Sequence, residues 1–141
     1  MNETNEKEIF DNFLAESSEI IRGLELGVIA LEKNPADRET IDDVFRCAHS
    51  LKGNTALFGL AGVRTLAHAV ENLMSRIRDG RMTADPRIIG LILGGVDHIK
   101  ALFSKIRPDG REGPLTTEQE RYLAGMELAL KEAGGTENEA L

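Results

Sequence analysis

The sequence predicts an all-α fold, an antiparallel up-down four-helix bundle with an additional fifth C-terminal helix. Apolar residues recur at three- and four-residue steps along nearly the whole chain, which is the period of an amphipathic helix. No segment alternates polar and apolar residues in the manner of a strand. The length of 141 residues suits one domain. Short links between the predicted helices favour antiparallel neighbours.

The first predicted helix is long and ends before Asn34 and Pro35, because proline disfavours a helical conformation in the residue before it. Asn5 is a candidate N-cap, and Glu8, three residues later, is its candidate return contact. The inward face consists of Phe10, Phe13, Ser17, Ile20, Leu24, Val28 and Leu31.

The second and third predicted helices are separated by a glycine. The second starts at Asp37, and its inward positions are Ile41, Val44, Ala48, Leu51, Thr55 and Phe58. Gly59 interrupts this pattern, and a third helix follows over residues 60–78. Asp79 and Gly80 end the third helix, since glycine is favoured just past a helix C-terminus.

The fourth predicted helix starts at Asp85 and Pro86, a capping carboxylate followed by a proline at the first helical position. Its apolar period continues to Pro108, where we expect it to stop. Residues 108–114 contain two prolines and two glycines and are the clearest loop of the chain.

The fifth predicted helix is shorter. Thr116 and Gln119 have the spacing of a capping box, and Gly134 and Gly135 are expected to end the helix. We therefore predict one domain over residues 1–134, followed at 135–141 by a flexible tail or the start of a linker.

The composition excludes several classes of function. Asp and Glu number 24 against 17 Lys and Arg, and this net charge of −7 argues against binding to nucleic-acid phosphates. Aromatic residues are only 4%, which disfavours base stacking. No apolar run approaches the ~20 residues of a membrane span. The polar, acidic start at residues 1–6 is unlike a secretory signal, and Cys47 has no partner for an internal disulfide. We expect a cytoplasmic domain with no nucleic-acid partner and no membrane insertion.

A search for catalytic and metal-binding motifs finds none of the common ones. The chain lacks a Gly-x-Ser-x-Gly element, a phosphate-binding loop, a Cys-x-x-Cys pair and a His-Glu-x-x-His pair. Cys47 is interpreted as a small packed helix residue. The three histidines, His49, His68 and His98, have spacings unrelated to a metal site, and His98 lies off the inward face of its helix. We expect no bound cofactor and no metal.

His49 stands out on the second predicted helix. At about 100° per residue it points roughly 130° from the centre of the apolar stripe, and therefore outward. Lys52 and Gly53 follow at i+3 and i+4 and are its surface neighbours. Glycine inside a helix costs about 1 kcal/mol relative to alanine, which makes sense where another molecule must approach the backbone. The alternative is that Gly53 is merely tolerated and His49 is a solvated surface residue.

A polar line follows on the third predicted helix at 4-3-4 spacing, made of Arg64, His68, Glu71 and Ser75. In an antiparallel pair this line could face His49. Glu71 could then accept a hydrogen bond from one ring nitrogen, fix the tautomer and leave the other nitrogen bare. Lys52 could attract an incoming phosphoryl oxygen. The alternative is that these residues are ordinary solvated helix charges.

Residues 45–60, Phe-Arg-Cys-Ala-His-Ser-Leu-Lys-Gly-Asn-Thr-Ala-Leu-Phe-Gly-Leu, resemble the phosphorylation-site helix of histidine phosphotransfer (HPt) domains, in particular the N-terminal domain of CheA-type chemotaxis histidine kinases. The core is His-x-Leu-Lys-Gly, with Phe-Gly nine residues after the histidine. His68-Ala-Val-Glu71-Asn is similar to the His-x-x-Glu-Asn element of the next helix, and the resemblance covers about residues 8–132. The Asn-Thr-Ala-Leu run after Gly53 departs from the Gly, Ala and Ser of many relatives.

The resemblance implies a role in two-component, chemotaxis-type signalling. By this resemblance His49 is the phosphoacceptor, Glu71 is its hydrogen-bond partner, Lys52 and His68 complete the polar network, and Gly53 lets a partner come close. The phosphoryl donor is then a separate histidine-kinase ATP-binding domain, which uses ATP and Mg, and the recipient is an aspartate of a response-regulator receiver domain. The chain is no enzyme on its own, is expected to be part of a histidine kinase, and is expected to be a monomer.

Two alternatives compete with this interpretation. One is a non-catalytic helical adaptor, a pseudo-phosphotransfer module in which His49 is incidental. The presence of His49, Lys52, Gly53 and Glu71 together speaks against it. The other is a metal-binding bundle that uses His68, Glu71 and another carboxylate, which elemental analysis of the purified protein would detect.

Overall fold

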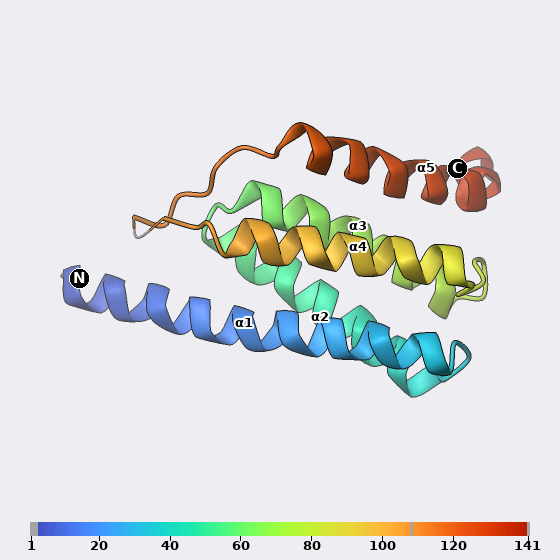
Figure 1. Cartoon of the computed structure of the whole chain (residues 1–141), viewed down its shortest axis with the longest axis horizontal. Coiled ribbons are helices and arrows are strands. Elements are labelled where there is room, and N and C mark those ends of the chain that lie inside the picture. The colour runs from blue at the N-terminus through green and yellow to red at the C-terminus, as the bar shows by residue number, and fades with distance from the viewer. Residues whose placement is uncertain (1–2, 108, 141) are drawn as a thin grey trace.

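The computed structural model describes residues 3–107 and 109–140, with only the backbone described at residues 3–4 and from residue 133 onward. No strand occurs in these ranges, so the all-α prediction is confirmed. The helices in chain order (Figure 1) are α1 Glu3–Lys33, α2 Arg38–Leu57, α3 Ala61–Arg78, α4 Pro86–Phe103 and α5 Thr117–Ala140.

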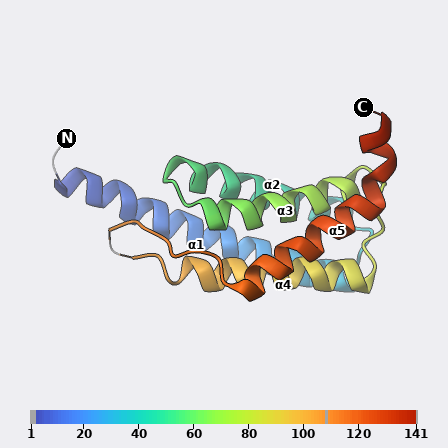
Figure 2. The ribbon, with the colours of Figure 1, turned by 90° about the horizontal axis from the view of Figure 1, so that it is seen from above.

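The first four helices form the predicted up-down bundle. Successive helices run in opposite directions, with α1 packed against α2 and α4, and α3 packed against the same two helices (Figure 1). The fifth helix lies across the outside of the bundle, on α3 and α4 (Figure 2). The outer face of α2 is therefore left uncovered by α5.

The core lies between the four bundle helices and extends under α5. Its largest completely buried side chains are almost all aliphatic, and full burial of one such side chain stabilises the fold by about 1.5–3 kcal/mol. They are Leu24, Val28, Leu31, Val44, Leu51, Leu60, Leu66, Leu73, Met74, Ile92, Ile99 and Met126. This packing holds α2 and α3 at a fixed register.

Several predicted helix ends are confirmed. The Asp37 carboxylate accepts from the backbone N–H groups of Glu39 and Thr40 at the start of α2. Asp85 accepts from Ile88 N–H at 2.9 Å at the start of α4. Thr116 and Gln119 form the reciprocal capping box, with N···O distances of 2.9 and 3.1 Å. Gly59 and Gly80 have positive φ angles of 70° and 76°, as a chain reversal after a helix requires.

Two predicted boundaries within the four-helix bundle are wrong. The first helix begins at Glu3, before the predicted cap Asn5. The fourth ends at Phe103, because the Ser104 hydroxyl bonds to the Ala101 carbonyl and Lys105 N–H bonds to the Leu102 carbonyl, which tightens the last turn. Pro108, the predicted stop, lies outside the described residues.

The fifth helix continues through Gly134 and Gly135 to Ala140, beyond the predicted end. Two glycines cost a helix about 1 kcal/mol each, which weakens the helix without forbidding it. The prediction of a flexible tail or linker at 135–141 is untested and stays a prediction, and Leu141 lies outside the described residues.

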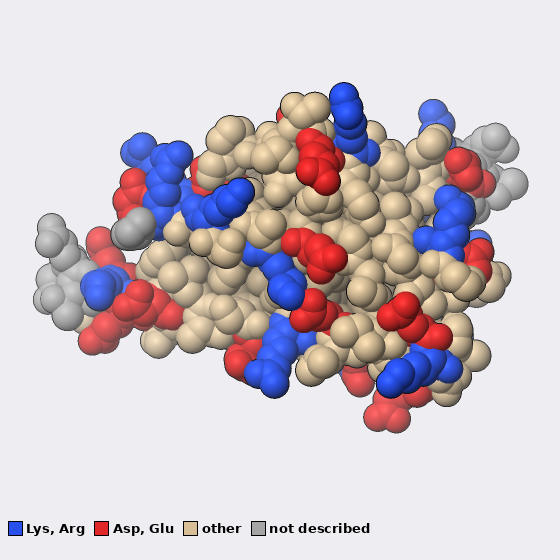
Figure 3. Space-filling view, viewed as in Figure 1, with Lys and Arg blue, Asp and Glu red and all other residues tan. Residues whose placement is uncertain are grey.

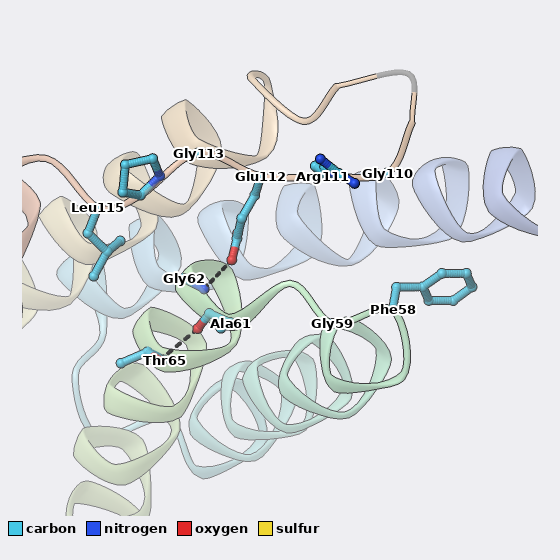
Figure 4. A pocket seen from close by; sticks show the side chains of 11 residues that line it. Phe58, Gly59, Ala61, Gly62, Thr65, Gly110, Arg111, Glu112, Gly113 and Leu115 are labelled. Carbon is cyan, nitrogen blue, oxygen red and sulfur yellow. Dashed lines mark hydrogen bonds between the residues drawn. The ribbon is translucent and has the colours of Figure 1, made fainter.

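The loop between α4 and α5 contacts the start of α3 (Figure 4). The carboxylate of Glu112 accepts hydrogen bonds from the backbone N–H groups of Gly62 and Val63, the latter at 3.2 Å. The residue in the N-cap position, Leu60, has no side chain that can do this. A carboxylate from a distant loop thus caps α3, at the end of the helix where negative charge is favoured.

Acidic and basic side chains are mixed over the face shown in Figure 3, with no large area of one sign. Within the described ranges, no helix is both long enough and apolar enough to cross a membrane.

Candidate functional site

His49 lies on the outer face of α2. The buried positions of this helix, Ile41, Val44, Ala48, Leu51 and Thr55, all lie on its opposite side. The His49 side chain is 62% exposed, as the helical geometry predicts. An imidazole in this position is accessible to another protein.

The buried carboxylate of Glu71 holds one edge of that imidazole. Glu71 projects from α3, and its Oε2 atom accepts a hydrogen bond from His49 Nδ1. The Glu71 side chain is only 8% exposed, although the ring that it holds faces solvent. The predicted contact between the polar line of α3 and the histidine of α2 is therefore present for Glu71.

Lys52 binds the other oxygen of the same carboxylate. Its Nζ atom lies 2.7 Å from Glu71 Oε1, and its side chain is three-quarters buried. Both Glu71 oxygens thus have a nitrogen partner, one from each of two residues a single turn apart on α2. In this arrangement Lys52 neutralises the carboxylate instead of standing free beside the ring.

These contacts determine the charge of Glu71. Burial on its own raises the pKa of the carboxyl group, but the hydrogen bonds from Lys52 and His49 and their positive charge outweigh burial and lower the pKa below its ordinary value. The carboxylate is therefore ionised at neutral pH.

The hydrogen bond to Glu71 also selects the tautomer of His49. Because a carboxylate can only accept, Nδ1 carries the proton in the neutral ring and Nε2 keeps its lone pair. Across the part of the chain that the structure describes, no hydrogen bond or ion pair involves Nε2. The neutral form of His49 thus has its lone pair on Nε2, on a side chain that is mostly exposed.

Phe45 lies beside the imidazole and Arg78 lies over the Phe45 ring, two residues that were not among the candidates predicted from the sequence. The Phe45 ring lies one turn before His49, with its centroid 6.2 Å from the imidazole centroid and its plane 12° away from parallel. The guanidinium carbon of Arg78, at the end of α3, lies 4.0 Å from the Phe45 ring centroid. The i−4 spacing of Phe45 from His49 was the available signal.

The structure leaves His68 outside this network. His68 is exposed on α3, one turn before Glu71, and no hydrogen bond or ion pair among the described residues links it to His49 or Glu71. Its predicted role stays a prediction.

Gly53 is exposed one turn after His49, and a Cβ atom added there would meet nothing within 4 Å. Packing inside the domain therefore does not require glycine at this position.

The remaining candidate residues have structural surroundings. Burial raises the pKa of the half-buried Cys47 thiol, and the nearby Asp43 charge raises it further, so the thiol is not activated as a nucleophile. The His98 ring packs against the Tyr122 ring at a centroid distance of 4.7 Å. Within the described ranges, no cluster of three or more His, Cys, Asp or Glu side chains is placed to hold a metal ion.

The chain is similar to known proteins in sequence and in fold. The family model described as Hpt domain matches residues 8–107. The chemotaxis protein CheA of Treponema pallidum (strain Nichols) is 30% identical over 128 residues, which are 91% of this chain and 15% of that protein. The chain therefore spans about one-seventh of the length of this relative.

Two solved structures are similar in fold. The CheA phosphotransferase domain from Thermotoga maritima is 32% identical, with a TM-score of 0.66 over 71% of this chain and 95% of that one. The phosphorylated P1 domain of CheA3 from R. sphaeroides, solved in complex with CheY6, is 22% identical, with a TM-score of 0.81 over 90% of this chain and 98% of that one.

Proposed function

The chain belongs to the Hpt domain family, and from this premise we propose that His49 carries a phosphoryl group between two partner domains of a chemotaxis-type two-component system. The observation that carries the proposal is the pairing of the exposed His49 ring with the buried Glu71 carboxylate. This pairing supplies an accessible nucleophile at Nε2 and a fixed negative charge behind it.

In the first step, the Nε2 lone pair attacks the γ-phosphorus of ATP held with Mg by a separate kinase domain. The N–P bond forms while the bond from phosphorus to the bridging oxygen breaks, and ADP leaves with that electron pair. The imidazole then carries a positive charge, and its Nδ1 proton stays hydrogen-bonded to Glu71. The domain contributes position and electrostatics, and it binds no cofactor of its own.

In the second step, a carboxylate oxygen of a receiver-domain aspartate attacks the same phosphorus. The N–P bond breaks, and its electron pair returns to Nε2, which restores the neutral imidazole. Glu71 stabilises the positive ring in between, and a hydrogen bond to a charged group contributes about 1.5–3 kcal/mol. Lys52 offsets the carboxylate charge, which would otherwise repel the incoming phosphoryl oxygens.

The comparisons support this assignment of partners. One structural neighbour is a phosphorylated domain in complex with CheY6, and the curated relatives are chemotaxis proteins. We propose that this chain receives its phosphoryl group from the ATP-binding domain of a CheA-like histidine kinase of which it is part. It passes the group to a response-regulator receiver domain, is no enzyme on its own, and acts as a monomeric unit.

The test is incubation of the protein with the ATP-binding domain of a CheA-type kinase and γ-labelled ATP. We expect an acid-labile, alkali-stable label that maps to His49 and is absent from His49→Gln. His98→Gln is the matched control, because its ring packs against Tyr122 away from the site, and it should be labelled normally. Normal labelling of His49→Gln would overturn the proposal. Binding of a receiver domain without any labelling would favour the non-catalytic adaptor.

A further inference from the structure

The Nε2 atom of His49 must point along a defined direction, and the hydrogen bond to Glu71 does not fix that direction alone. The lone pair lies in the plane of the imidazole, so the direction of attack follows the tilt of the ring. A hydrogen bond at Nδ1 tolerates considerable tilt, since its strength falls steeply only when the angle at hydrogen drops below about 120°. With 62% of its side chain exposed, His49 needs a second contact to set the plane of its ring.

Phe45 is the residue in the described part of the chain that supplies such a contact. Its ring is 12° from parallel to the imidazole at a centroid separation of 6.2 Å, within the range of about 4.5–7 Å for offset aromatic pairs. Both side chains come from α2 and are one turn apart. The Phe45 ring therefore lies nearly parallel to the imidazole and offset from it, while Glu71 holds the Nδ1 edge.

Arg78 in turn restricts the Phe45 ring. Its guanidinium carbon lies 4.0 Å from the ring centroid, the geometry of a cation–π contact. The guanidinium also lies 3.6 Å from the Asp79 carboxylate, and the Arg78 carbonyl accepts a hydrogen bond of 3.2 Å from Arg38. The end of α3 is thereby tied to the start of α2, and the contact from His49 through Phe45 to Arg78 spans both helices.

We propose that Phe45, backed by Arg78, is a positioning residue that sets the plane of the His49 imidazole for phosphoryl transfer. The proposal rests on the proposed function of His49. It assigns Phe45 no contact with the phosphoryl group, so its removal should slow the chemical step and leave partner affinity unchanged.

The first test compares three variants in phosphorylation by a CheA-type ATP-binding domain and labelled ATP. Phe45→Leu keeps an apolar side chain and removes the flat face, and it should lower kcat by about tenfold with KM unchanged, since small misplacements of a reacting group are costly. Phe45→Tyr keeps the ring and should restore the rate. Arg78→Met keeps Phe45 and should lower kcat in the same direction. Arg22→Gln, an exposed arginine on α1, is the control.

Three results would overturn the proposal. The first is an unchanged kcat for Phe45→Leu in a folded protein. The second is a change in KM alone, which would make Phe45 a partner contact. The third is a Phe45→Tyr protein as slow as Phe45→Leu. If Phe45→Leu does not fold, the kcat of Arg78→Met tests the proposal instead. A wild-type kcat in Arg78→Met would contradict the proposal.

A second measurement needs no kinase, so its outcome is independent of the proposed function. The order parameter and ring-current shifts of the His49 imidazole are measured by NMR in the unphosphorylated protein. Phe45→Leu should increase ring motion and remove the shift, and Phe45→Tyr should retain both. Unchanged ring order in Phe45→Leu would refute the positioning role. Wild-type protein that takes no label at all would instead refute the proposed function.

Discussion

At the scale of single residues, the site depends on a buried carboxylate with two nitrogen partners. Glu71 holds the exposed His49 ring through one oxygen and the three-quarters-buried Lys52 through the other. An ionised carboxylate is costly to bury unless it is paired, so each contact supports the other. In the proposed transfer, the same charge that selects the Nδ1–H tautomer of the neutral ring also stabilises the positive ring.

Glu71→Gln should slow phosphoryl acceptance by about tenfold, because a neutral amide keeps the shape and a hydrogen bond but loses the charge assistance of roughly 1.5 kcal/mol. The variant should fold, and long-range ¹H–¹⁵N NMR should show a mixture of His49 tautomers in place of one. Single-turnover labelling with a CheA-type kinase domain measures the rate. An unchanged rate would remove the electrostatic role of Glu71.

The lowered pKa of Glu71 also predicts a pH dependence of stability. A carboxyl group whose pKa is lower in the folded state stabilises the fold above its unfolded pKa of about 4.3, and this contribution is lost as the pH falls through the folded value. The free energy of unfolding of wild type minus that of Glu71→Gln should therefore be larger at pH 7 than at pH 3. Urea unfolding of both proteins measures it, and a difference that grows at pH 3 would contradict the assignment.

At the scale of helices, α5 packs closely against two glycines of α4, Gly94 and Gly95. The Tyr122 ring packs directly over Gly94, and Met126 Sδ lies 3.0 Å from the position of a Cβ on Gly95. The Tyr122 hydroxyl donates to the Leu91 carbonyl at 2.6 Å. This close approach fixes α5 on the side of the bundle formed by α3 and α4, away from the outer face of α2.

Gly94→Val should therefore weaken the docking of α5. Any Cβ at this position overlaps the Tyr122 ring, and overpacking of this kind costs about 1–3 kcal/mol. Gly90→Val is the matched control, since Gly90 lies one turn earlier on α4 and has open space at its Cβ position. Urea unfolding should show the position-94 variant less stable than the position-90 variant by that amount. Equal free energies of unfolding for the two variants would mean that the docking of α5 does not depend on the contact between Tyr122 and Gly94.

Local sequence signals predicted most of the helices and, within the site, the outward direction of His49 and the position of Glu71. The 3-4 period, the caps at Asp37 and Asp85 and the Thr116 capping box act within one or two turns, so they can be read from sequence alone. The outward direction of His49 follows from the same period. The sequence also predicted that Glu71 faces His49, because antiparallel helices joined by a short turn must pack on each other.

Long-range contacts account for the rest. Glu112 caps α3 from a loop about fifty residues away, and the Phe45–Arg78 contact joins the first half of α2 to the last residue of α3. Neither contact produces a pattern in the local sequence, because each depends on how the helices and the loop pack against one another in the folded bundle. The pairing of Lys52 with Glu71, in place of a free lysine beside the ring, likewise depends on the exact register of α2 against α3.

At the scale of the whole molecule, the bundle supports the exposed imidazole of His49 on the outer face of α2. Four helices bury a common aliphatic core, and α5 covers α3 and α4 while α2 keeps an open outer face (Figures 1 and 2). Two different partners must reach His49 in turn for a relay to work, and this open face permits both. Membership in the Hpt domain family and the geometry of the site agree on this role.

The most direct test of the account is to determine which nitrogen of His49 becomes phosphorylated. Phosphorus on Nε2, with the Nδ1 proton still hydrogen-bonded to Glu71, is the result that the structure predicts. Combined ³¹P and ¹⁵N NMR of the phosphorylated, ¹⁵N-histidine-labelled protein distinguishes the two nitrogens. Phosphorus on Nδ1 would contradict the account, because Glu71 contacts that nitrogen in the structure. Phosphorus on a residue other than His49 would also contradict it, because Glu71 would then support a group that takes no part in the transfer.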